Sequence, residues 1–187
     1  MNETAEKIVF FLNDVFMEVM GSSEDLKSLE ECVDDVEAVL KYELKNMSEG
    51  DEAQREKTPL EKEMEKEYET AMRRRQLQDM VFSLITMSKV FDYPTTAKII
   101  ETFLIDPLNL IVDSLKKKHE GKENAELDKE DKLYLKSQIR KIRGKIDEEI
   151  IGKDYVRKRD KKPGNDTKDL ELSDDKFLKR NQLRKEK

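Results

Sequence analysis

Apolar side chains recur every three or four positions between residues 26 and 47, and acidic side chains fill the opposite positions. This spacing predicts an amphipathic α-helix of about 22 residues. A face of that length needs apolar cover, either from other helices of the chain or from a partner that lends apolar surface. We name this face the central stripe and expect it first of all to belong to a core. Its members are Leu26, Leu29, Val33, Val36, Leu40, Leu44 and Met47.

The remaining segments show helical periodicity as well. They predict helices over residues 4–20, 59–91, 95–104, 107–115 and 128–151. Thr58 can cap the second of these helices, and Glu61 completes a capping box. The chain has only six glycines, and glycine is the residue that tight turns between strands most often require. We therefore predict an all-α fold, as a histone-fold-like arrangement or a small helical bundle with extra C-terminal helices and a flexible basic tail.

The distribution of charge divides the chain into an acidic front and a basic back. Residues 1–112 hold 13 basic and 25 acidic side chains, whereas residues 113–187 hold 24 basic and 18 acidic ones. We expect a helical core over residues 1–118, a charged amphipathic helix over 119–152 and a disordered basic tail over 153–187. The opposite charges of front and back indicate different partners for the two halves.

The side chains that catalysis usually needs are scarce. The chain holds one histidine, His119, in a charged loop, and one cysteine, Cys32, in an apolar helical pattern. No pair of Cys or His residues is spaced for a zinc site, and no glycine-rich phosphate loop occurs. The alternating carboxylates over residues 61–69 spread around a helix instead of converging. We predict a protein that is not an enzyme, with no cofactor, no metal and no small-molecule substrate.

The sequence features that bear on location favour an intracellular protein. No run of 18 apolar residues occurs, and the N-terminus lacks the basic flank of a signal peptide, so we expect no membrane association. A single cysteine fits a reducing compartment. The basic run RKRDKK at residues 157–162 is typical of a nuclear-import signal. The nucleus is therefore the favoured location, with the cytoplasm as the alternative.

The same basic tail is a candidate nucleic-acid interface. Clustered Lys and Arg side chains can neutralise phosphates with little sequence preference, although acidic residues interrupt these runs. Few aromatic residues lie among them, so base stacking is not indicated. The candidate phosphate-binding residues are Arg157, Lys158, Arg159, Lys161, Lys162, Lys179, Arg180 and Arg184.

Two stretches resemble the TBP-associated factor 13 family, which comprises a small histone-fold subunit of TFIID and a SAGA relative of the Spt type. Residues 33–40, VDDVEAVL, resemble the family's central-helix run of Val-Asp, an aliphatic-Glu step and paired aliphatics. Residues 76–82, QLQDMVF, resemble its third-helix opening, in which an acidic pair precedes Ile-Val-Phe.

This resemblance implies a histone fold that acts by heterodimerisation with a second histone-fold protein. The assembly would be of the TFIID type, which positions TBP at promoters, and the chain itself would catalyse nothing. A lone histone fold leaves its central stripe exposed until the partner covers it. The residues implied to contact that partner are Val33, Val36, Leu40, Leu44, Phe82 and Leu84.

Two other functions fit the same sequence. A ribosome- or RNA-associated factor would dock on protein through its helices and on RNA through its basic tail. A helical scaffold would self-associate without either partner. The apolar pattern also fits a three-helix bundle of residues 26–48, 59–91 and 95–117 as well as it fits a histone fold.

Overall fold

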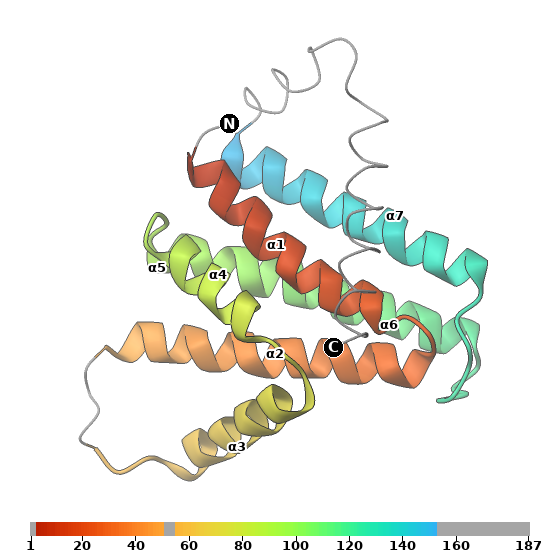
Figure 1. Cartoon of the computed structure of the whole chain (residues 1–187), viewed down its shortest axis with the longest axis horizontal. Helices are drawn as coiled ribbons and strands as arrows, with labels where there is room; N and C mark the ends of the chain where they lie inside the picture. The colour runs from red at the N-terminus through yellow and green to blue at the C-terminus, as the bar shows by residue number, and fades with distance from the viewer. Residues whose placement is uncertain (1–2, 51–54, 153–187) are drawn as a thin grey trace. The chain divides into compact units, whose positions relative to one another are not determined.

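The computed structural model describes residues 3–50 and 55–152, and within these ranges every regular element is a helix (Figure 1). The predicted all-α class is confirmed. The elements are α1 (Glu3–Gly21), α2 (Leu26–Glu49), α3 (Pro59–Arg74), α4 (Gln78–Ser88), α5 (Tyr93–Lys98), the π-helix η1 (Ile99–Ile105), α6 (Asp106–Lys118), α7 (Lys129–Ile146) and the π-helix η2 (Asp147–Ile151).

The described residues divide between two units, one within residues 1–143 and one that begins at residue 144. The first unit is a bundle that contains α1 to α6 and most of α7. In the second unit the described residues are 144–152, which hold the end of α7 and η2. Gly152 follows η2 with a φ of 98°, a conformation that suits glycine at the end of a helix.

Helix α1 supplies the largest buried side chains of the bundle. Ile8, Phe11 and Phe16 are at most 1% exposed, and α1 contacts both α2 and α4. Full burial of each such side chain contributes on the order of 2 kcal/mol. Helix α1 therefore supplies some of the bulkiest side chains of the core, while α2 is the longest helix.

Helix α2 packs against α3 and also contacts α1 and α6 (Figure 1). The central stripe faces these neighbours: Leu26, Leu29, Val33, Val36, Leu40 and Leu44 are at most 3% exposed. The prediction that this stripe belongs to a core is confirmed for these six residues, and Met47 at its end is half-buried. Tyr42 of α2 also stacks on Tyr68 of α3, with ring centroids 4.3 Å apart, so α3 is fixed along one side of α2.

The predicted helix over residues 59–91 is wrong in one respect, because the chain turns at Arg75 and forms two helices. Arg75 has an extended backbone, with φ −133° and ψ 149°. Its guanidinium binds Asp35 at 2.9 Å and Ser22 at 2.9 Å. These bonds fix the turn between α3, which lies on α2, and α4, which lies on α1. As a result α3 packs on α2, whereas α4 packs on α1.

The predicted break between the helices over residues 95–104 and 107–115 is also wrong. Residues 93–118 remain helical through α5, η1 and α6, and Ile105 itself has helical φ and ψ values of −65° and −53°. Pro107 occupies the first turn of α6, where a missing N–H is tolerated.

The start of α7 is attached to the rest of the bundle at two places. Leu26 N donates to Ala125 O at 2.9 Å, and Leu127 N donates to Glu24 O at 3.0 Å, which forms a short antiparallel bridge. Asp131, which is 1% exposed, binds His119 at 2.9 Å and Lys118 at 2.6 Å. The end of α6 and the start of α7 are thereby joined.

Candidate functional site

Helix α4 carries large apolar side chains on the side that faces the core and two more on the side that faces solvent. Met80, Leu84 and Met87 point inward and are at most 1% exposed. On the other side, Phe82 is 73% exposed and Ile85 is 39% exposed. The solvent side of a helix on the surface of a bundle is normally polar. Helix α4 therefore carries apolar surface that the described part of its own chain leaves uncovered.

Helix α1 extends this apolar surface. The two helices pack against each other and run in opposite directions (Figure 1). Ser83 of α4 donates a hydrogen bond to Asp14 of α1, which fixes their register. Phe10 lies one helical turn before Asp14 and is 64% exposed. The antiparallel arrangement consequently places Phe10 beside the last turn of α4.

The connection from α4 to α5 adds two further apolar side chains, Val90 and Tyr93, which are 37% and 44% exposed. Asp92 between them caps α5 by accepting a hydrogen bond from Thr95 N at 2.8 Å. We define the α4 face as the side chains of Phe10, Phe82, Ile85, Val90 and Tyr93. These are five of the eight large apolar side chains that are exposed in the described ranges. Such a concentration is typical of an interaction surface, whereas single exposed apolar residues are ordinary.

Charged side chains of both signs border the α4 face. The carboxylates at neighbouring helical positions are Glu3, Glu6, Asp14, Asp79 and Asp92. The neighbouring cations are Lys89, Lys7, which is bound to Glu3 at 3.0 Å, and Arg143 of α7, which donates to Asn13 at 2.5 Å. Hydrogen bonds from Thr95 lower the pKa of Asp92, so its carboxyl is ionised at neutral pH. Most of these charged groups are thus already engaged by other groups of the chain.

The residues implied to bind a histone-fold partner fall into two groups. Val33, Val36, Leu40, Leu44 and Leu84 are at most 3% exposed and are covered by helices of their own chain. The expectation that the central stripe stays uncovered until a partner binds is therefore corrected, because α1, α3 and α6 already pack against α2. Phe82 alone of the six is exposed.

The candidate nucleic-acid-binding residues lie outside the described residues. All eight, from Arg157 to Arg184, fall within 153–187. A contact with phosphate through the tail stays a prediction of the sequence.

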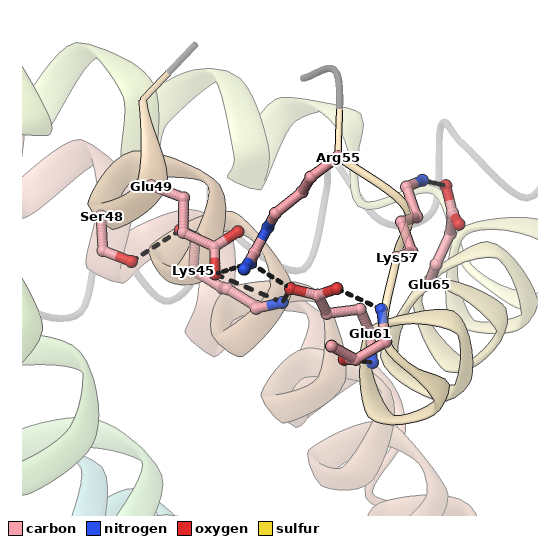
Figure 2. A network of polar contacts seen from close by, with 8 residues as sticks. Lys45, Ser48, Glu49, Arg55, Lys57, Glu61 and Glu65 are labelled. Atoms are coloured by element: carbon pink, nitrogen blue, oxygen red, sulfur yellow. Dashed lines mark hydrogen bonds and ion pairs between the residues drawn. The ribbon is translucent and has the colours of Figure 1, made fainter. Parts of the chain in front are cut away.

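A second candidate site is a polar cavity of about 360 Å³ between α2 and the start of α3. Figure 2 shows the charged side chains that surround it. Glu61 is bound by Lys45 at 2.7 Å and by Arg55 at 2.6 Å. Lys57 binds Glu65 at 2.6 Å. The three cations are thus paired with carboxylates of the same network, and the cavity offers no surplus charge to a ligand.

Glu61 also completes the predicted capping box, which is confirmed. Its carboxylate accepts from Thr58 N at 2.6 Å, and Glu61 N donates to Thr58 Oγ1 at 3.3 Å. The hydrogen bond from Lys45 is the main reason that the pKa of Glu61 falls to about 2, and the bond from Thr58 adds to it. This network fixes the start of α3 on α2, which is a structural role.

Cys32 and His119, the single cysteine and histidine of the chain, lie where they contribute to packing and helix contacts. Cys32 is fully buried, and burial raises the pKa of its thiol to about 11, which makes it a poor nucleophile. His119 joins α6 to α7 through Asp131. Within residues 3–50 and 55–152, no group of three or more His, Cys, Asp or Glu side chains is arranged to hold a metal ion.

No protein-family model, curated protein or solved structure matches the chain. None of the helices in the described ranges combines the length and the apolar character needed to cross a membrane.

Sequence reasoning found Phe82 but missed the other members of the α4 face, namely Phe10, Ile85, Val90 and Tyr93. A signal for α4 was present. Residues 81 and 82 are both apolar, as are residues 84 and 85, and such adjacent pairs put apolar side chains on more than one side of a helix. No comparable signal existed for Phe10, because its exposure depends on how α1 packs against α4.

Proposed function

We propose that this chain is a non-enzymatic interaction protein that binds a helical segment of a protein partner on the α4 face. The observation that carries the proposal is the position of Phe82. It lies 73% exposed on a helix whose opposite side is packed into the core. The bundle thus holds α4 firmly while its outer side stays accessible.

The energetics of this surface suit a binding site. Burial of an exposed Phe or Ile side chain contributes about 1.5–3 kcal/mol. Aromatic side chains surrounded by smaller contacts often dominate the affinity of an interface. Phe82 and Ile85 lie three positions apart on α4, so one partner helix can cover both at once. The self-paired charges around the α2–α3 cavity favour a binding role over a catalytic one.

The resemblance to the TBP-associated factor 13 family provides one class of partner for this proposal. It implies a histone-fold protein within a transcription-initiation assembly of the TFIID or SAGA type. Phe82 supports this version, because it is both implied as a partner contact and exposed in the structure. Native purification after nuclease treatment tests it. Recovery of a histone-fold protein together with TBP is expected, and their absence would remove this class of partner.

Site-specific photo-crosslinking tests the proposed binding face. A benzophenone amino acid would replace Phe82 in the full chain inside cells. Matched probes would replace Leu133 of α7 and Leu110 of α6, which are 58% and 66% exposed outside the α4 face. The proposal predicts a defined crosslinked protein from position 82 that the two control positions do not yield. Equal crosslinking from all three positions, or none from position 82, would contradict it.

A further inference from the structure

We draw no further inference here: the strongest candidate, the exposed apolar patch of the α4 face as a site for a partner of one particular chemistry, carries nothing, because nothing in the described ranges shows what covers this patch and the charged side chains of both signs around it are mostly engaged by other groups of the chain.

Discussion

Arg75 donates a hydrogen bond from Nε to Oδ2 of Asp35 across 2.9 Å and so joins the α3–α4 turn to the middle of α2. Asp35 is only 6% exposed, although it carries a charge in a helix that faces the core. Arg74 reaches the same carboxylate at 3.4 Å. This contact fixes the turn after which the chain packs on α1 instead of α2. It therefore positions α4, whose outer side belongs to the α4 face.

Arg75→Ala should destabilise the bundle. The change leaves a buried carboxylate with a single weaker partner and removes a bond to Ser22, which together cost about 3 kcal/mol. Urea denaturation followed by circular dichroism measures the free energy of unfolding. Arg74→Ala is the matched control, because the Arg74 side chain is 46% exposed and its loss should cost less than about 1 kcal/mol. Equal effects of the two variants would show that Arg75 does not organise the turn.

Acid should loosen α3 from α2 through Glu61. Its pKa is about 2 in the folded chain against an ordinary value of 4.5, so ionised Glu61 favours the folded contact. The stabilisation is complete above about pH 4.5 and is lost as the pH falls towards about 2. The stacked Tyr42 and Tyr68 provide a near-ultraviolet circular dichroism signal for this contact.

The variant Glu61→Gln separates this effect from general acid unfolding. It should be less stable than the unchanged chain at neutral pH, and the difference should vanish near about pH 2. Glu63→Gln, at an exposed position on the same helix, should show no pH-dependent difference. A gap between Glu61→Gln and the unchanged chain that persists at low pH would contradict the role of the Glu61 carboxylate.

Asp131→Asn should separate the start of α7 from the end of α6. Burial alone would raise the pKa of Asp131, but hydrogen bonds from Lys118 and His119 outweigh it and hold this pKa below its ordinary value. The folded chain therefore favours the carboxylate, and its contribution is present above about pH 4 and is lost in stronger acid. Loss of these charge-assisted bonds should cost about 2 kcal/mol.

Hydrogen exchange at residues 119–135 would report this opening locally. Faster exchange is expected there in Asp131→Asn, while α2 should be little affected. Glu130→Gln is the control, because the Glu130 side chain is 85% exposed and meets Lys118 only at 3.6 Å. Protection in Asp131→Asn equal to that of the control would rule out the proposed junction.

Periodicity predicted the helices well, because amphipathic spacing reflects burial directly. The central stripe, the capping box at Thr58 and Glu61, and the all-α class are all confirmed. The turn at Arg75 could not be predicted, because it depends on Asp35 and Ser22, which lie 40 and 53 positions away. Local propensity alone favours a continuous helix there, and a tertiary contact overrides it.

The candidate site could be predicted only in part. Phe82 could be selected as a partner contact, but helical spacing does not state which apolar face the chain itself covers. The central stripe and the outer side of α4 both carry apolar side chains at helical spacing, and the packing of α1, α3 and α6 on α2 separates them. An apolar residue such as Phe10 is buried or exposed according to its neighbours in space.

The affinity of the protein crosslinked at position 82 for purified variants tests the account most directly. Calorimetry would compare the unchanged chain, Phe82→Asp and Leu133→Asp at equal concentrations. We predict that Phe82→Asp weakens binding about 30-fold or more, as expected when a central aromatic contact worth about 2 kcal/mol is lost. Leu133→Asp should bind within about twofold of the unchanged chain. Equal binding by both variants, with unchanged helicity, would show that the α4 face is not the site of interaction.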